Sequence, residues 1–507
     1  MDKVVIFDTT LRDGEQAAGG ALTTTEKLDI GRQLEKLGVD IIEAGFPHTS
    51  QGDFEAVELL SKKLKDCRIA ALSGFKREQI DSTWAALKGA VAPLLHVVIS
   101  TSDIHLNQQL HMSREEVLGL TTDAVAYAKQ YCSDMEFSAM DATRSDPDYL
   151  CQVLAAAVRA GATIINVPDT VGYVQPDEFG QLISYVKENV PGIEKVVISI
   201  HCHDDLGQAV ANSLRAVELG ARQVECTING VGERAGNAAL EEIVMALITR
   251  KDFYKVETNV DPVQIYRTSR MVSRYMGMEV PPNKAIVGAN AFAHASGLHQ
   301  DGMLKDSSTY EIMTPNSIGV SKSRIALGKT SGRHAVRDRL QKLGHSLSDE
   351  EFAKTFEAYK ELADKKKEIT EADLDSLVAD ELRTMAETYH LEHVQVSCGE
   401  PAVPTASVKL IGPNGEVLTR SAYGTGPVDA IYQAIKRLVD VPGEHKLAEF
   451  SVKSVTEGID AMGEVTIKVE SDGISYIGKG VSTDIIVASA KAYMNALNRL
   501  LASKKRS

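Results

Sequence analysis

Residues 28–44 read LDIGRQLEKLGVDIIEA and contain one complete step from a helix to a strand. Ile30, Leu34 and Leu37 follow one another at intervals of four and three residues, which is typical of the apolar face of a helix. Gly38 suits the left-handed cap that ends such a helix. The apolar run that follows, residues 39–44, has the composition of a buried parallel strand. This stretch therefore predicts a βα repeat.

The same unit recurs from residue 4 to about residue 250. Gly161-Ala162 and Gly220-Ala221 again stand where a helix would end and a strand begin. Eight strand-like runs result, at Val4–Phe7, Val39–Ala44, Arg68–Leu72, Leu95–Ser100, Met135–Ser138, Thr163–Val167, Val196–His201 and Gln223–Thr227. Eight βα units in about 250 residues predict an α/β fold with a closed (β/α)8 TIM barrel. A doubly wound open sheet is the alternative, although it usually has fewer strands and a glycine-rich first turn.

The pattern changes after the barrel. We expect a catalytic barrel over residues 1–270, helical linker subdomains that complete the active site over 271–390, and a regulatory α/β domain over 391–507. The middle part contains helical segments near Asp349–Ala363 and Ala372–Tyr389. The last part shows strand-like runs at Val394–Val396, Ala406–Ile411, Ala448–Val452 and Glu464–Val469, and helices near Pro427–Val439 and Ser482–Leu501.

Composition excludes several classes of partner. The 507 residues include 55 Lys and Arg against 70 Asp and Glu, a formal net charge of −15, which argues against a nucleic-acid surface. No run of about 18 apolar residues indicates a membrane span, and the chain enters a strand-like segment within four residues, so we expect a cytoplasmic protein. The six cysteines form no Cys-x-x-Cys pair, which favours reduced thiols over a disulfide framework.

Polar residues at the carboxyl ends of barrel strands converge on one mouth, so they are the first candidates for function. His201 and His203 are two residues apart at a strand end, which places both imidazoles on one side. Asp13 follows the first strand and can approach them, because only the eighth strand separates the first from the seventh. Two imidazoles and a carboxylate suit a divalent ion such as Mn²⁺, Mg²⁺, Co²⁺ or Zn²⁺. A hydrogen-bonded strand terminus is the alternative for the two histidines alone.

Arg12, next to the expected metal ligand, would face an oxyanion that forms on the bound substrate. A buried ion pair with Asp8 or Glu43 is the alternative for this side chain. Two further segments stay open. The glycines of residues 230–236 are a weak signal for a phosphate loop, and residues 294–302 hold either proton-transfer groups or ordinary loop donors.

Five motifs spread over the chain resemble the 2-isopropylmalate synthase family. They are Phe7–Gln16 (FDTTLRDGEQ), Asn166–Tyr173 (NVPDTVGY), His201–Gly207 (HCHDDLG), Asn229–Asn237 (NGVGERAGN) and Asn290–Gly302 (NAFAHASGLHQDG). Residues 423–430 and 458–463 are similar to that family's leucine-sensing regulatory domain. The first motif also occurs in related metal-dependent acyltransferases and lyases, whereas the long middle motif and the regulatory domain favour the synthases.

The resemblance implies an acyltransferase that condenses acetyl-CoA with 3-methyl-2-oxobutanoate, the committed step of leucine synthesis, and that leucine inhibits. It further implies a homodimer or homotetramer, Mn²⁺ as the first choice of metal, and room for a monovalent cation such as K⁺. By position, the resemblance assigns the metal to Asp13, His201, His203 and Asn237, and the keto acid to Arg12, His96, Ser138 and Thr170. It assigns acetyl-CoA to Glu233, Asp301 and Tyr310, and catalysis to Arg12, His299 and Asp301. The expected effector residues are Gly424, Gly426, Asp460 and Ala461.

Three positions depart from the family pattern. Met140 stands where the family usually has a glutamate, Ala17-Ala18 replaces a common Ser-Pro, and Thr330 stands where a histidine is frequent. A thioether transfers no proton, so Met140 suggests a larger and more apolar pocket. The alternatives are therefore a sibling synthase for another 2-oxo acid (citramalate, homocitrate or benzylmalate type), a lyase of the same barrel family, and a non-catalytic amino-acid sensor.

Overall fold

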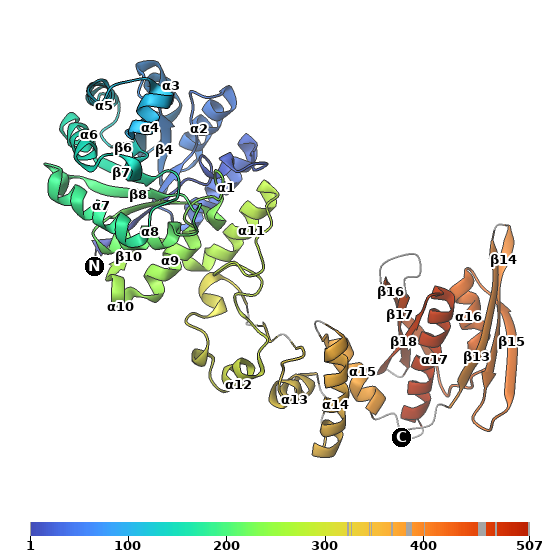
Figure 1. Cartoon of the computed structure of the whole chain (residues 1–507). Helices are drawn as coiled ribbons and strands as arrows, with labels where there is room; N and C mark the ends of the chain where they lie inside the picture. Colours follow the sequence, from blue (N-terminus) through green and yellow to red (C-terminus); the bar gives the residue numbers. More distant parts are fainter. Residues whose placement is uncertain are drawn as a thin grey trace. The chain divides into compact units, whose positions relative to one another are not determined.

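The computed structural model describes residues 2–321, 324–325, 327–343, 345, 347–366, 369–381, 388–399, 401–454, 463–471 and 474–504. Its contacts divide the chain into two compact units, Met1–Val336 and Arg337–Ser507. In Figure 1 the first unit runs from blue to yellow and the second from yellow to red. No described helix is both long and apolar enough to cross a bilayer.

The first unit contains a closed parallel barrel, and β9 completes it by pairing with β2. Its strands are β2 (Val5–Asp8), β3 (Ile41–Glu43), β4 (Arg68–Ser73), β5 (Pro93–Ser100), β6 (Met135–Met140), β7 (Ile164–Asp169), β8 (Val197–Cys202) and β9 (Gln223–Cys226). Each predicted strand is present within a few residues of its expected bounds. The predicted (β/α)8 barrel is confirmed, and the open-sheet alternative is wrong.

Helices connect the strands around the outside of the barrel. They are α1 (Thr24–Leu37), α2 (Gln51–Lys63), α3 (Arg77–Leu87), α5 (Arg114–Ala128), α6 (Pro147–Ala160), α7 (Pro176–Asn189), α8 (Ala209–Glu218) and α9 (Leu240–Thr249), with the short α4 (Asp103–His105) and α10 (Lys251–Tyr254). Local signals set their ends, as in α1, where Thr23 and Glu26 form a capping box and Gly38 adopts the left-handed conformation with φ 84°. Outside the barrel, β1 (Asp2–Lys3) pairs with β10 (Val256–Glu257), and α11 (Ile265–Met276) packs against α1.

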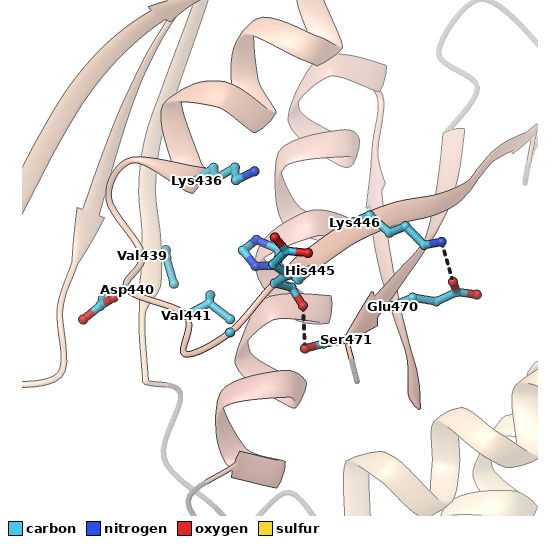
Figure 2. A pocket seen from close by; sticks show the side chains of 10 residues that line it. Lys436, Val439, Asp440, Val441, His445, Lys446, Glu470 and Ser471 are labelled. Carbon is cyan, nitrogen blue, oxygen red and sulfur yellow. Dashed lines mark hydrogen bonds and ion pairs between the residues drawn. The ribbon is translucent and has the colours of Figure 1, made fainter. Parts of the chain in front are cut away.

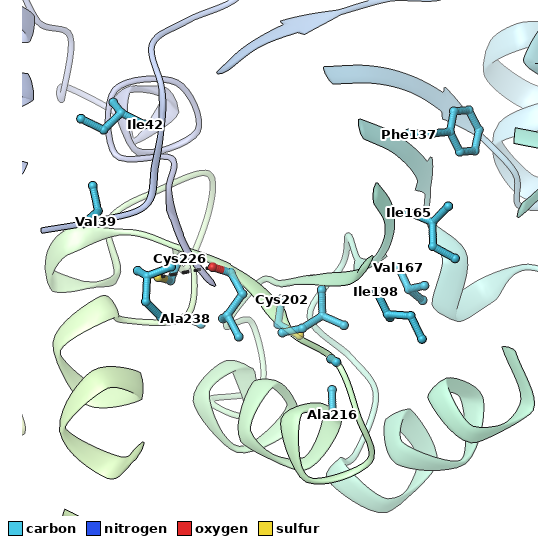
Figure 3. Close-up of a cluster of buried hydrophobic side chains, with 14 of the residues drawn as sticks. Val39, Ile42, Phe137, Ile165, Val167, Ile198, Cys202, Ala216, Cys226 and Ala238 are labelled. Carbon is cyan, nitrogen blue, oxygen red and sulfur yellow. Dashed lines mark hydrogen bonds between the residues drawn. The ribbon is translucent and has the colours of Figure 1, made fainter. Parts of the chain in front are cut away.

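Alternation along each strand separates the outer core from the barrel interior. On β8, Ile198 and Cys202 belong to the large apolar cluster shown in Figure 3, together with Ala216 of α8. Inside the barrel, a small apolar cluster of Phe7, Ile41, Ala70, Leu94 and Ile164 lies near the amino ends of the strands. Above it the interior is polar, with the buried side chains Glu43, His96, Glu136, Ser138, Asn166, Ser199, His201, Gln223 and Glu225. A barrel interior is usually filled with branched apolar residues, so this polar filling marks the mouth end as the candidate site.

The remainder of the first unit is a smaller segment. In it β11 (Ala293–His294) pairs with β12 (Arg324–Ile325), and α12 covers Gly297–Lys305. The histidine-rich residues 294–302, which the sequence left open as loop donors, are therefore partly helical. Helix α13 (Arg333–Lys342) follows.

The second unit, which starts within α13, includes α14 (Asp349–Lys365) and α15 (Glu371–Glu381). It continues as a repeated arrangement of three antiparallel strands and a helix. The first copy consists of β13 (His390–Gly399), β14 (Ala402–Ile411), β15 (Val417–Tyr423) and α16 (Pro427–Lys436), and the second of β16 (His445–Ser454), β17 (Gly463–Ser471), β18 (Ile474–Ser482) and α17 (Ile485–Lys504). The expected α/β architecture is confirmed.

Strands β15 and β18 were not predicted. Gly478 and Gly480 interrupt the strand pattern of β18, but they have a packing reason. A Cβ at Gly478 would lie 2.0 Å from the Ala492 carbonyl oxygen of α17, and one at Gly480 would lie 2.1 Å from the Ala488 carbonyl oxygen. These glycines let the helix pass close over the strand.

Candidate metal centre and active site

Asp13, His201 and His203 lie together at the mouth of the barrel, all buried, and their potential ligand atoms fall within 4.8 Å of one another. His201 is the penultimate residue of β8, and His203 follows the strand. A tight turn after β2 carries Asp13 to them, since the Arg12, Asp13 and Gly14 amides all donate to the Thr9 carbonyl. The structure thus brings together three of the four predicted metal ligands from opposite ends of the barrel sequence.

Each imidazole is oriented by a hydrogen bond from its Nδ1 atom. His203 Nδ1 lies 2.7 Å from the Thr170 carbonyl oxygen, and His201 Nδ1 lies 2.8 Å from Glu225 Oε2. The Thr170 carbonyl and a Glu225 carboxylate both accept from Nδ1, so Nε2 is the atom that each ring can offer to a metal. Burial lowers the pKa of His201 to about 4, so this ring is neutral at pH 7, the state that a metal ligand requires.

Asp13 stays ionised in this buried position. Burial alone would raise its pKa, but the Arg12 guanidinium and the hydrogen bond from His203 hold that pKa well below its ordinary value. One carboxylate oxygen, Oδ1, lies 2.6 Å from Arg12 Nη1, and the other lies 3.1 Å from His203 Nε2. The cluster therefore offers one carboxylate and two imidazoles, a suitable set for a divalent cation.

The fourth predicted ligand is Asn237, and the hydrogen bonds of its amide group test whether this cluster suits a metal ion. Its Nδ2 donates to Asp13 Oδ2 at 2.6 Å and to the Val231 carbonyl at 3.1 Å. Its Oδ1 is buried and has no hydrogen-bond partner. An unsatisfied buried acceptor costs about 1–3 kcal/mol and calls for an explanation. A cation beside Asp13 would satisfy this oxygen, so the residues present fit a metal ion.

The loop that carries Asn237 approaches the cluster closely because it is rich in glycine. A Cβ at Gly232 would lie 2.1 Å from Asn237 Nδ2 and 3.3 Å from Asp13 Oδ2. At Gly236, φ is 92° and a Cβ would lie 1.9 Å from the Gly230 carbonyl oxygen. The glycines of residues 230–236, which resembled a phosphate loop, therefore serve to bring Asn237 to the metal cluster.

The sequence left open whether Arg12 forms a buried ion pair with Asp8 or Glu43. In the structure, Arg12 forms this ion pair with Glu43 and not with Asp8. Its Nε lies 2.6 Å from Glu43 Oε2, while Asp8 instead accepts hydrogen bonds from Thr10. Arg12 thus bridges Glu43 and Asp13 with its fork of donors. Its side chain is 12% exposed, so it still reaches the mouth of the barrel.

Glu43 continues this chain of contacts into the barrel. Its Oε1 lies 2.7 Å from His96 Nδ1, and His96 Nε2 lies 2.7 Å from Ser138 Oγ. Burial lowers the pKa of His96, but the Glu43 carboxylate outweighs it and raises that pKa to about 9. His96 and Ser138, predicted around the keto acid, therefore form a buried network behind Arg12, and both nitrogens of His96 are already bonded.

Thr170 and Met140 lie nearby at the mouth. The Thr170 carbonyl holds His203, and its Oγ1 accepts from the Asp141 amide at 2.8 Å. Met140 ends β6 and is partly buried. Glu233 is exposed in the loop that leads to Asn237.

Apart from Glu233, the residues predicted for acetyl-CoA chemistry, His299, Asp301 and Tyr310, lie in a separate segment. His299 stacks on Tyr310 with ring centroids 4.1 Å apart, and Asp301 pairs with Lys305 at 2.6 Å and with His334 at 2.9 Å. These contacts stay within residues 299–334, and the structure describes no contact of His299, Asp301 or Tyr310 with the metal cluster.

Sequence reasoning missed the polar residues deeper in the barrel, Glu136, Gln223 and Glu225. A signal was present, because Gln223 and Glu225 alternate on a short strand that should be buried on both faces. Gln223 Nε2 donates to both carboxyl oxygens of Glu136 at 2.9 Å. Together with His96, Glu136 and Glu225 form a second close group of buried titratable side chains.

The predicted effector residues are only partly described. Gly424 lies in a tight turn before α16, where a Cβ would be 2.4 Å from the Ala430 amide nitrogen, and Gly426 is the N-cap of that helix. Asp460 and Ala461 lie outside the described residues. A cavity of about 770 Å³ lies beyond the other end of α16 and is lined by both acidic and basic side chains, but by neither Gly424 nor Gly426. Figure 2 shows the side chains that line it.

Comparisons with known proteins cover the whole chain. Residues 3–272 match the HMGL-like family, residues 286–367 the family described as homocitrate synthase post-HMGL domain-like, and residues 368–501 the LeuA allosteric (dimerisation) domain. The 2-isopropylmalate synthase of Gloeobacter violaceus is 55% identical over 98% of this chain and 95% of its own length. Those of Pelotomaculum thermopropionicum (55%, covering 98% of both chains) and Trichodesmium erythraeum (56%, covering 100% of this chain and 96% of its own) are equally similar.

Proposed function

The chain belongs to the 2-isopropylmalate synthase family, and we propose that it condenses acetyl-CoA with 3-methyl-2-oxobutanoate and water to give 2-isopropylmalate and CoA. The family consists of acyltransferase-type condensing enzymes. The observation that carries the proposal is the buried cluster of Asp13, His201 and His203, with the unpartnered Asn237 oxygen beside it.

We propose that Asp13, His201, His203 and Asn237 hold a divalent cation, Mn²⁺ first among Mg²⁺, Co²⁺ and Zn²⁺. When bound, such an ion acts as a Lewis acid on the carbonyl of a 2-oxo acid. A monovalent cation such as K⁺ is a further candidate cofactor. Oxygen and nitrogen ligands of this kind do not select one of these metals by themselves.

Arg12 has the position and the charge to stabilise the alkoxide that develops from the keto oxygen. Glu43 and Asp13 hold its guanidinium on two sides, at 2.6 Å each, so it needs no reorganisation during the reaction. Its pKa is raised by these carboxylates, against the effect of burial, so it stays charged. His96, Ser138 and Thr170 complete the proposed surroundings of the keto acid.

The proton of the acetyl-CoA methyl group must leave as the new carbon–carbon bond forms. We propose that His299 and Asp301 serve this step and that Glu233, Asp301 and Tyr310 bind acetyl-CoA. His299 is exposed and Asp301 partly exposed, consistent with groups that meet a second substrate from solvent. Water then cleaves the thioester and releases CoA, which draws the condensation forward.

For the carboxyl-terminal part we propose feedback inhibition by leucine through residues 391–507, with Gly424, Gly426, Asp460 and Ala461 at the effector site. The match to an allosteric and dimerisation domain supports this role and a homodimer or homotetramer. We further propose barrel and linker domains over residues 1–270 and 271–390, and a cytoplasmic location.

A second candidate keeps the reaction but changes the keto acid. Met140 ends β6 at the mouth and is partly buried, so its thioether would favour a bulkier or more apolar 2-oxo acid. Release of CoA in the presence of Mn²⁺, followed with a thiol reagent, tests both candidates and the sensor alternative. Replacement of His203 by alanine should remove nearly all release, and wild-type turnover in that variant would contradict the metal assignment.

A further inference from the structure

Glu225 is a carboxylate enclosed by the barrel, where a charge is costly. It is 1% exposed, and it faces the interior from β9, the strand next to β8. An apolar side chain of similar volume would fill this position at a lower cost in desolvation. Stability alone therefore does not explain why a glutamate stands at position 225.

The register of strands β8 and β9 places Glu225 beside His201, a predicted metal ligand. Glu225 and His201 are direct partners in the pairing of β9 with β8, so their side chains stand side by side on the inner face. Glu225 Oε2 lies 2.8 Å from His201 Nδ1, and the described structure gives this nitrogen no other partner. The ring plane of His201 lies at 85° to that of His203, with centroids 4.9 Å apart. The bond to Glu225 thus determines where His201 Nε2 points.

A second pair of side chains, Gln223 and Ser199, forms a hydrogen bond across the same two strands, next to Glu225 and His201. Gln223 and Ser199 are register partners one step down the same strands, and Gln223 Nε2 donates to Ser199 Oγ at 3.0 Å. Gln223 also fixes both oxygens of Glu136, which lies against Glu225. Glu225 therefore lies beside a layer of hydrogen-bonded polar side chains, formed by Ser199, Gln223 and Glu136.

We infer that Glu225 is the positioning residue of the metal centre, holding His201 with Nε2 directed at the ion while His203 is held by a backbone carbonyl. This inference rests on the proposed metal site. It adds a side chain that touches neither the metal nor the substrate and acts through His201 alone. A carboxylate in this place also makes the imidazole a stronger ligand.

Titration of the full-length chain with Mn²⁺, followed by the electron paramagnetic resonance of the free ion, tests the inference without reference to activity. We expect E225A to bind Mn²⁺ about 10- to 100-fold more weakly than the wild type. E225Q, whose amide oxygen still accepts from Nδ1, should lose less. The control S61A, which removes a buried hydroxyl on α2 that contacts neither a predicted ligand nor Glu225, should bind within about twofold of the wild type.

Two outcomes would overturn the inference. If E225A and E225Q bind Mn²⁺ as the wild type does, His201 does not need Glu225. If the wild type itself binds no Mn²⁺, the metal site and this inference both fail. Should E225A not fold, nitrogen-15 labelling of histidine in the Mg²⁺-loaded wild type decides, because we expect His201 to carry its proton on Nδ1, and a proton on Nε2 would refute the proposal.

Discussion

Asn237 donates a hydrogen bond from Nδ2 to Asp13 Oδ2 across 2.6 Å, although 224 residues separate the two in the chain. The bond joins the loop after the last barrel strand to the turn after the first. It also directs the other end of the amide, Oδ1, into a buried position without a partner. This pair defines the metal centre more sharply than the two histidines alone.

Replacing Asn237 with alanine should weaken Mn²⁺ binding at least about tenfold, because the variant lacks Oδ1, the proposed ligand atom. The thermal stability of the metal-free protein should fall as well, because the amide nitrogen also donates to the Asp13 carboxylate and to the Val231 carbonyl. Calorimetric titration with Mn²⁺ and a thermal melt of the metal-free protein measure both effects. Unchanged affinity would show that Asn237 is not a ligand.

Gly232→Ala should disturb the centre by crowding Asn237, without replacing any of the proposed ligands. The new methyl group would lie 2.1 Å from Asn237 Nδ2, so the amide must turn away from Asp13. We expect a loss of Mn²⁺ affinity and of kcat with an intact fold. Gly207→Ala is the control for a glycine with φ above zero in a neighbouring loop, because a Cβ there meets nothing within 4 Å. Equal effects of the two variants would argue against the proposed crowding.

Arg12→Lys keeps the charge but loses the fork that bridges Glu43 and Asp13. If Arg12 stabilises the developing alkoxide, kcat should fall by about 10²- to 10³-fold, the usual effect of losing one oxyanion donor. Steady-state kinetics with saturating substrates measures this. A change in thermal stability with kcat retained would mean that the ion pair with Glu43 is structural only.

Stability should depend on pH through Asp8. Burial raises the pKa of Asp8 to about 7 from an ordinary value of 3.8, so the folded chain holds a proton that the unfolded chain releases. Asp8 therefore contributes stability below about pH 4 that is lost as the pH rises through 7, at up to about 1.4 kcal/mol per pH unit. Asp8→Asn mimics the protonated acid and should flatten the decline of the thermal midpoint between pH 4.5 and 7.5. An identical pH profile in both proteins would exclude Asp8 as the cause.

Removal of residues 391–507 should leave condensation and abolish inhibition by leucine. Residues 391–507 contain their own apolar core, made from β14, β17, α16 and α17, so their removal should not expose the barrel core. Initial rates with and without leucine, for the full and the shortened chain, measure this. Inhibition that persists in the shortened chain would place the effector site elsewhere.

The barrel could be predicted because each βα unit carries its own signals, such as the helix face of residues 30–37 and the cap at Gly38. The close approach of Asp13, His201 and His203 could be predicted because the strand ends of a closed barrel converge on one mouth. Glu225 and Glu136 were missed although they lie on strands that a parallel barrel buries on both faces, because their proximity to His96 follows only from the closed barrel. Strand β18 was missed because Gly478 and Gly480 are atypical of a strand. The close packing of α17 on this strand explains both glycines.

The central claim is a metal-dependent condensation on a branched 2-oxo acid. The most direct test is kcat/KM for CoA release from acetyl-CoA with 3-methyl-2-oxobutanoate, pyruvate and phenylpyruvate, each with Mn²⁺ and with a chelator. We predict the highest value for 3-methyl-2-oxobutanoate with Mn²⁺, and loss of release when the metal is removed. Release that persists without metal, or a clear preference for pyruvate or phenylpyruvate, would contradict the account.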